Sequence, residues 1–225
     1  MKLEPRLIAT HVPAGPEAAV LVLHGGAGRS GNMMVSPTQL SVLRMIPIAA
    51  RLAHAGAKRL AVYRLLNSRR GWDTKHTPVD DVRWALRELA ERFGSELPVG
   101  LVGHSLGGRA AILAATQPQV RSVVALAPWV YPNDGDRDLS GRRVLIVHGD
   151  HDRIARPANS ATVARALGRT ADVGYITVLG GKHAMLRHHA EFDGLAAQFA
   201  AATLLGDPAT GPVERVLAGE HWLQV

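Results

Sequence analysis

A serine flanked by glycines lies where an apolar run gives way to a helical pattern. Gly103, Ser105 and Gly107 match the pattern GxSxG, which follows the apolar residues VGLV and precedes RAAILAA. A serine in a tight strand-to-helix turn needs neighbours without Cβ atoms, so that the backbones can approach while the hydroxyl projects clear. The unpaired amides at the start of the following helix, beginning with that of Leu106, are suited to stabilise an oxyanion. The motif therefore indicates a nucleophilic serine.

A serine hydroxyl needs a general base, and that base needs a carboxylate to orient it. Two later apolar runs end in suitable residues. VLIVHGDHDRIA carries Asp150 and Asp152, and YITVLGGKHAML carries His183. The order serine, aspartate, histidine is the order in which α/β-hydrolases arrange their catalytic triad along the chain. We therefore expect a triad of Ser105, one of these aspartates and His183.

On these residues the sequence resembles the α/β-hydrolase superfamily, in particular its compact, lidless serine esterases and dienelactone-hydrolase-like members, over about residues 7–204. The family's acid usually closes an HGxxD pattern, here His148 to Asp152, so the resemblance implies Asp152 as the acid and leaves Asp150 to cap the loop. The family's histidine usually follows a glycine-containing turn, which implies His183 as the base.

A second fingerprint of the family is HGG after an early strand, matched here by His24-Gly25-Gly26. In relatives this loop donates the second amide of the oxyanion hole. Here that amide belongs to Gly26 or Ala27, and we favour Gly26. The imidazoles of His24 and His104 are expected to organise loops through hydrogen bonds rather than to take part in catalysis.

The resemblance implies a serine hydrolase that cleaves a carboxylic ester or thioester through an acyl-enzyme intermediate. Such a reaction needs no cofactor and no metal. Two alternatives use the same fold: an acyltransferase or cyclase acting through the same triad, and a binding module without catalysis. An intact nucleophile turn, acid, base and oxyanion loop favour catalysis.

The substrate itself is far less readable from the sequence. Only residues 127–141 separate the apolar run that follows the nucleophile region from the next one, which leaves no room for a large helical lid. Met33 and Met34 lie in one long loop, Trp72 lies in a second, and Trp129 lies at the shortened lid position. Apolar side chains near a catalytic serine suggest a substrate-binding role for these four residues, although packing of loop against core explains each equally well.

Short apolar runs alternate with helical patterns along the chain, as a parallel sheet covered on both faces requires. The pattern predicts strands at 7–12, 18–23, 59–65, 99–102, 122–126, 144–147 and 174–179, and helices at 45–54, 79–93, 109–116, 158–167 and 191–204. We therefore expect an α/β fold, a three-layer open and mostly parallel sheet, in one domain of residues 1–225 with its core at about 7–204. Residues 205–225 form a C-terminal tail to which we assign no role.

The composition excludes several classes of function. The formal net charge is +7, but the basic residues are scattered and aromatic residues make up only 4%, so we expect no nucleic-acid partner. The absence of cysteine excludes a thiolate nucleophile. The sequence shows neither a leader-like apolar segment nor a run approaching the ~18 apolar residues of a membrane span. We expect a cytoplasmic monomer or homodimer without a membrane partner, acting on a small ester or thioester.

Overall fold

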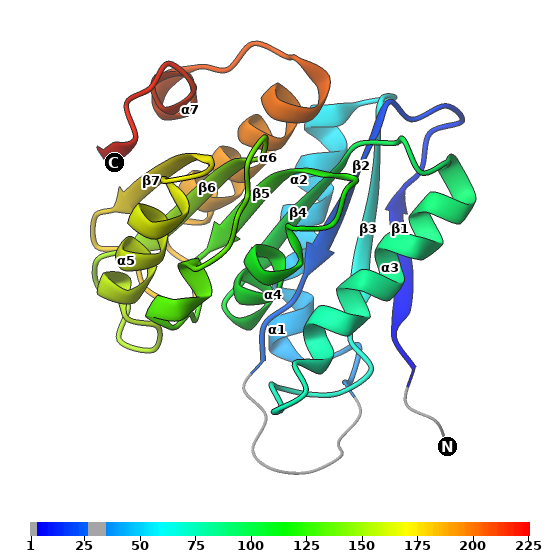
Figure 1. Cartoon of the computed structure of the whole chain (residues 1–225), viewed down its shortest axis with the longest axis horizontal. Helices are drawn as coiled ribbons and strands as arrows, with labels where there is room; N and C mark the ends of the chain where they lie inside the picture. Colours follow the sequence, from blue (N-terminus) through cyan, green and yellow to red (C-terminus); the bar gives the residue numbers. More distant parts are fainter. Residues whose placement is uncertain (1–3, 27–34) are drawn as a thin grey trace.

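The computed structural model describes residues 4–26 and 35–225, and within them an eight-stranded sheet flanked by helices (Figure 1). The strands are β1 Arg6–His11, β2 Ala18–Leu23, β3 Leu60–Leu66, β4 Val99–His104, β5 Val120–Leu126, β6 Arg143–Gly149, β7 Asp172–Val178 and β8 Trp222–Gln224. The helices are α1 Leu40–Leu43, α2 Met45–Gly56, α3 Thr77–Phe93, α4 Leu106–Ala114, α5 Pro157–Leu167, α6 His189–Leu205 and α7 Gly211–Leu217, with a 3-10 turn η1 at Pro132–Gly135.

Continuously apolar strands produce a sheet that is buried on both faces. All six residues of β2 are buried, and they alternate between two hydrophobic cores. Ala19, Leu21 and Leu23 belong to one core, and their neighbours Ala18, Val20 and Val22 belong to the other. Full burial of one such aliphatic side chain contributes about 1.5–3 kcal/mol, so both cores stabilise the sheet.

Helices cover each core. α3, α4 and α5 supply side chains to the core that contains Leu21, whereas α2, α6 and α7 supply side chains to the core that contains Val20. Figure 1 shows α3, α4 and α5 in front of the sheet, with α2 and α6 behind it. The fold is therefore the expected three-layer α/β arrangement.

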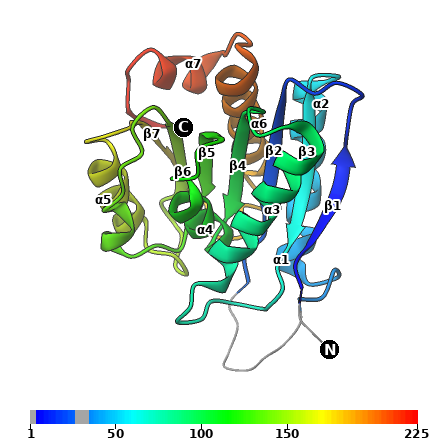
Figure 2. The same ribbon diagram turned by 45° about the vertical axis from the view of Figure 1, so that its right-hand side comes forward.

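The strand order is β1-β3-β2-β4-β5-β6-β7-β8, and only β1 runs antiparallel to its neighbour. Figure 2 shows β1 at one edge of the sheet, with the chain's C-terminus close to β7. Because the other strands run in one direction, their carboxyl ends meet along one edge of the sheet. Active groups of open α/β sheets lie at this edge.

The predicted strands and helices all form. The structure adds the short elements α1 and η1, which were not predicted, and differs from the prediction in two further places. α4 begins at Leu106, directly after Ser105, rather than at residue 109. The tail, to which we had assigned no role, forms α7 and then β8, which pairs with β7 and extends the sheet. Between β5 and β6 the chain forms only η1, so this position carries no large lid. No helix in the described ranges has the length and apolar character needed to cross a membrane.

Candidate active site

Ser105 occupies the turn between β4 and α4 in a backbone conformation that is rare for serine. Its φ is 56° and its ψ is −118°, and a residue held in such a region costs about 1–3 kcal/mol unless its surroundings stabilise it. Three backbone hydrogen bonds do so here. Its amide donates to the Leu126 carbonyl at 3.0 Å, and its carbonyl accepts from Arg109 at 3.2 Å and from Trp129 at 3.1 Å.

The glycines around Ser105 permit contacts that any Cβ atom would prevent. A Cβ on Gly103 would lie 2.2 Å from the carbonyl oxygen of Gly107, and one on Gly107 would lie 2.3 Å from that of Leu23. Such distances are far below van der Waals contact. The GxSxG pattern is thus a packing requirement: β2, β4 and α4 approach one another closely enough to hold Ser105 at the sheet edge.

The structure brings the three predicted triad residues into one hydrogen-bonded chain. His183 Nε2 lies 3.0 Å from Ser105 Oγ, and His183 Nδ1 lies 2.8 Å from Asp152 Oδ2. The side chain of His183 is 12% exposed and that of Asp152 is fully buried. When Asp152 is ionised it only accepts, so Nδ1 of the neutral imidazole carries the proton and Nε2 is left to accept one from the serine.

Asp152 is held as a charged carboxylate in the interior. Its Oδ1 accepts the amides of Ile154 at 2.8 Å and Ala155 at 2.9 Å, and its Oδ2 accepts from His183 and also from His148, whose Nε2 lies 3.0 Å away. Burial by itself raises the pKa of Asp152, but these hydrogen bonds outweigh it and lower the pKa well below the usual value. The acid of the site therefore remains ionised at neutral pH.

A close contact between two glycines packs the loop that carries Asp152 against the loop that carries His183. A Cβ on Gly149 would lie 2.2 Å from the carbonyl oxygen of Gly181, which in turn accepts the amide of His151 at 3.0 Å. Asp150 caps this junction, because its Oδ1 accepts the amide of Gly180 at 2.7 Å. Asp150 thus has the loop-capping position that the sequence suggested, and Asp152 is the aspartate that meets His183.

The HGG segment lies directly beside Ser105. A Cβ on Gly25 would lie 2.9 Å from the Cβ of Ser105. His24 fastens the segment, because its Nδ1 donates to the Gly25 carbonyl at 2.6 Å while its Nε2 accepts the Asn67 amide at 3.2 Å. Burial lowers the pKa of His24, which keeps the ring neutral for these bonds. Gly26 follows with a φ of 127°, a conformation that favours glycine.

The roles of Gly26 and Leu106 in binding an oxyanion stay predictions. Leu106 is the first residue of α4, where helix amides lack intrahelical partners. Ala27, the alternative to Gly26, lies outside the described residues, and so do Met33 and Met34.

A buried arginine that the sequence analysis did not single out connects two loops near the site. Arg109 Nε and Nη2 bind the carboxylate of Asp134 at 2.8 and 3.0 Å. Its guanidinium lies 4.3 Å from the ring centroid of Trp72 and 4.7 Å from that of Tyr131. Trp72 therefore packs on this ion pair, and its predicted contact with substrate stays a prediction. These partners of Arg109 lie far from it in the sequence, so no local sequence pattern indicated the cluster.

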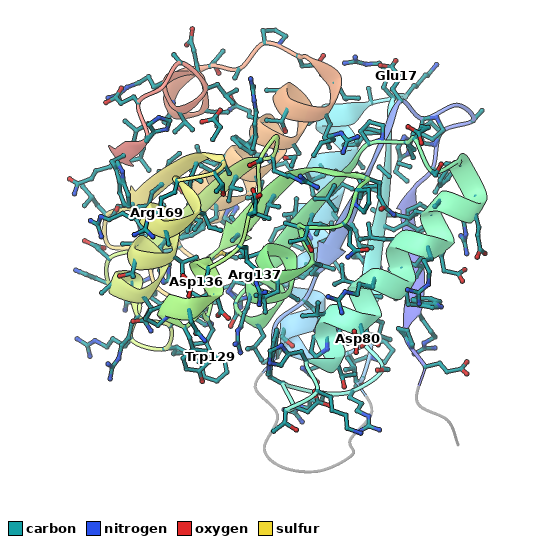
Figure 3. All side chains as sticks on the ribbon, viewed as in Figure 1. Glu17, Asp80, Trp129, Asp136, Arg137 and Arg169 are labelled. Atoms are coloured by element: carbon teal, nitrogen blue, oxygen red, sulfur yellow. The ribbon has the colours of Figure 1, made fainter. Side chains whose placement is uncertain are left out.

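Trp129 is half-buried and lies close to the nucleophile along the backbone, since its amide bonds the carbonyl of Ser105. In Figure 3 Trp129 lies at the lower edge of the molecule. Its ring neighbours that of Tyr131, with centroids 6.0 Å apart. Its predicted role in substrate binding also remains a prediction.

Among the described residues, two hollows adjoin the loop that carries His183, and Ala184 lines both. One, of about 350 Å³, lies between the start of α2 and the start of α6, and its apolar lining includes Leu40, Leu43, Met185 and Leu186. The other, of about 580 Å³, is lined by His183 itself together with polar and charged side chains, among them Arg153 and Lys182. Both volumes fall in the range of small-ligand sites.

Comparisons with known proteins identify the family. Residues 20–144 match the model of the alpha/beta hydrolase family, and the chain belongs to that family. A search of the curated proteins found no match.

Several solved structures share the fold at low sequence identity. A serine hydrolase without a lid from Xanthomonas campestris, XC6422, is 18% identical with a TM-score of 0.64, over 94% of this chain and 99% of that one. Est1E from Butyrivibrio proteoclasticus, solved with ferulic acid bound, is 16% identical with a TM-score of 0.65, over 89% and 96%. An alpha-beta serine hydrolase homologue from Coxiella burnetii is 18% identical with a TM-score of 0.64, over 86% and 90%.

Proposed function

We propose that this protein is a serine hydrolase that cleaves a carboxylic ester or thioester through an acyl-enzyme intermediate. The observation that carries the proposal is the continuous hydrogen-bond chain from Ser105 Oγ through His183 to Asp152. The position of Ser105 at the start of α4, with Gly25 pressed against it, supports the same reaction. Similar structures described as a serine hydrolase and a serine hydrolase homologue add to this support.

The geometry fits the following sequence of steps. His183 Nε2 takes the proton of the Ser105 hydroxyl as its oxygen attacks the carbonyl carbon of the substrate, and Asp152 stabilises the imidazolium that forms. The oxyanion of the tetrahedral intermediate is bound by the amides of Leu106 and Gly26. His183 then gives the proton to the departing alcohol or thiol, which leaves an ester on Ser105. Water, activated by the same imidazole, releases the acid and restores the serine.

The apolar hollow supports a substrate with an apolar part. Its lining residues Met185 and Leu186 follow His183 almost directly, and Leu43 lines it from α1. The residues Leu40 and Leu186 are 79% and 70% exposed. Neighbouring apolar side chains exposed to water are typical of a surface that binds an apolar ligand. We propose that the hollow receives the acyl chain of the ester.

A fluorophosphonate probe and a panel of esters test the proposal. The probe should modify Ser105 alone, as located by peptide mass spectrometry, and Ser105→Ala should remove both the label and turnover, with a loss of kcat of about a thousandfold or more. The panel should include acyl chains of increasing length, matched thioesters and a ferulate ester, because Est1E was solved with ferulic acid. An unlabelled and inactive protein with a normal circular dichroism spectrum would favour the binding-module alternative.

A further inference from the structure

The hydrogen-bond chain of the triad does not end at Asp152 but continues into the core. His148, at the end of β6, is fully buried, and its Nε2 lies 3.0 Å from Asp152 Oδ2 and 3.2 Å from the carbonyl oxygen of Ala155. Its Nδ1 lies 2.8 Å from Ser160 Oγ on α5. Ser160 Oγ in turn lies 3.0 Å from the hydroxyl of Tyr175 on β7.

The partners fix which nitrogen of His148 carries a proton. A carboxylate oxygen and a backbone carbonyl can only accept, so Nε2 carries a proton and donates toward Asp152 and Ala155. Asp152 then has two donors on each oxygen: the amides of Ile154 and Ala155 on Oδ1, and the imidazoles of His148 and His183 on Oδ2. Four donors fill the acceptor sites of a carboxylate, so it cannot rotate without losing bonds.

We propose that His148 is a positioning residue for catalysis: it holds Oδ2 of Asp152 at the point where that oxygen orients His183, and Ser160 and Tyr175 hold the ring of His148 in turn. This role rests on the proposed function, because it concerns the same triad. His148 touches neither substrate nor Ser105 and acts only through Asp152. The elements that carry the acid and the base, β6 and β7, are thereby connected by side chains as well as by the sheet.

Both imidazoles bind the same oxygen, which is why the inference goes beyond satisfying a buried polar group. If His148 served the core alone, its bond to the Ala155 carbonyl and its bond to Ser160 would be enough. The bond to Asp152 instead divides the charge of Oδ2 between two donors. Besides Asp152 and His183, the titratable group that faces His148 is Tyr175, reached through Ser160.

Two amide substitutions separate the proposed role from a role in folding. The amide nitrogen of glutamine in His148→Gln falls near the Nε2 position and can still donate to Asp152, whereas that of asparagine in His148→Asn falls near Nδ1 and cannot reach it. Both variants keep a polar, uncharged group in the same place. A purely structural role predicts similar losses of thermal stability and unchanged kcat per site labelled by fluorophosphonate.

We expect His148→Asn to lower kcat per labelled site at least tenfold with KM within about twofold, and His148→Gln to stay within about threefold of the wild type. The hydrogen-bond partners that orient metal ligands have effects of about 10–100-fold, and His148 orients Asp152 in the same way. The acid limb of the pH–rate profile of His148→Asn should move to higher pH. Without its second donor on Oδ2, the Asp152 carboxylate takes up a proton more readily, because the hydrogen bond from His148 lowers its pKa. Equal kcat values for the two variants, or an unmoved acid limb, would overturn the proposal.

A measurement that needs no substrate separates this inference from the proposed function. The proton on His183 Nδ1 should give a low-field ¹H NMR signal, assigned by its loss in His183→Gln. In His148→Asn this signal should shift or broaden, and in His148→Gln it should remain near its wild-type position. An unchanged signal in both variants contradicts positioning by His148, whether or not an ester substrate is found. Absence of labelling and turnover in the wild type, with a signal that responds to His148, would instead contradict the hydrolase proposal alone.

Discussion

His104 donates a hydrogen bond from its Nε2 to the backbone carbonyl of His183 at 2.9 Å, so the residue before Ser105 holds the loop that carries His183. The two imidazole rings lie 4.9 Å apart between centroids. A carbonyl only accepts, so the proton is on Nε2, and among the described residues Nδ1 of His104 has no hydrogen-bond partner. Burial, with a smaller effect of His183 nearby, lowers the pKa of His104 to about 3. The ring is therefore neutral at neutral and mildly acidic pH.

The buried His104 should make the protein less stable in acid. In the unfolded chain a histidine takes up a proton near pH 6.5, whereas folded His104 does so only near 3. Between these values the unfolded state binds the extra proton, so the free energy of unfolding falls as the pH falls, by up to about 1.4 kcal/mol per pH unit for this group. Urea unfolding of wild type and His104→Gln at pH 7, 6 and 5 checks this. The advantage of wild type over the variant should shrink toward acid, and parallel curves would contradict it.

Substitution of the two aspartates of the HGDHD segment, Asp150 and Asp152, should have very different effects on kcat. Asp152→Asn removes the charge that stabilises the imidazolium of His183, and we expect kcat to fall about 10³–10⁴-fold with little change in KM. Asp150→Asn is the matched control, because Asp150 accepts only a loop amide in the structure and should retain activity within about threefold. Steady-state kinetics on one ester decides. Equal losses in the two variants would mean that the acid is assigned to the wrong residue or shared.

The glycines of the nucleophile turn should not tolerate a methyl group. Gly107→Ala places a Cβ 2.3 Å from the Leu23 carbonyl oxygen, and the required backbone shift should cost about 1–3 kcal/mol of unfolding free energy and lower fluorophosphonate labelling of Ser105. Gly15→Ala is the control, because a Cβ there meets nothing within 4 Å, and it should change stability by less than about 0.5 kcal/mol. A Gly107→Ala protein with wild-type stability and labelling would argue against the close approach described for this turn.

Removing one partner of the Arg109–Asp134 ion pair should lower the free energy of unfolding more than removing both partners would suggest. Both side chains are largely buried, 9% and 4% exposed. Arg109→Leu leaves the Asp134 carboxylate without its cation, and we expect a loss of about 3–5 kcal/mol in unfolding free energy. Arg109→Leu combined with Asp134→Leu should cost less than the sum of the single changes, which a double-mutant cycle in urea measures. Additive losses would show that the two side chains act independently.

The apolar hollow should set the preference for acyl length. Leu43→Trp adds bulk to its lining, so kcat/KM for an octanoyl ester should fall about tenfold or more while that for an acetyl ester stays within about twofold. Ile46→Trp is the control, since Ile46 is similarly exposed on the adjacent α2 but does not line the hollow. If Leu43→Trp affects both esters equally, the acyl chain binds elsewhere.

The sheet, and the meeting of Ser105, Asp152 and His183 at one end of it, could be expected from strand order, whereas the choice of Asp152 over Asp150 came from the family resemblance. Apolar strands of a parallel sheet end at a common edge, so polar residues just after β4, β6 and β7 had to meet there. The start of α4 was placed too late, because Gly107 and Gly108 have low helix propensity although they occupy the first turn. The three-residue strand β8 escaped prediction because it is too short to show a strand pattern.

The supporting shell of the site could not be predicted in the same way. His148 was visible only as part of the HGxxD pattern, and its partners Ser160 and Tyr175 come from α5 and β7. Arg109 reads as a surface residue of a helix until Asp134 and Trp72 are brought to it by the fold. Local patterns specify elements, whereas burial of a polar side chain depends on partners that only tertiary contacts supply.

The positive φ of Ser105 can be maintained only in the folded protein. This φ of 56° is accompanied by hydrogen bonds to Arg109 in the helix that follows it and to Leu126 and Trp129 at and just after the end of β5. A newly made or partly unfolded chain lacks them, so its serine relaxes to an ordinary conformation and is chemically as inert as any other hydroxyl. If Ser105 is the proposed nucleophile, its reactivity is thereby restricted to correctly assembled molecules, and a serine-directed label would count the native fraction of a sample.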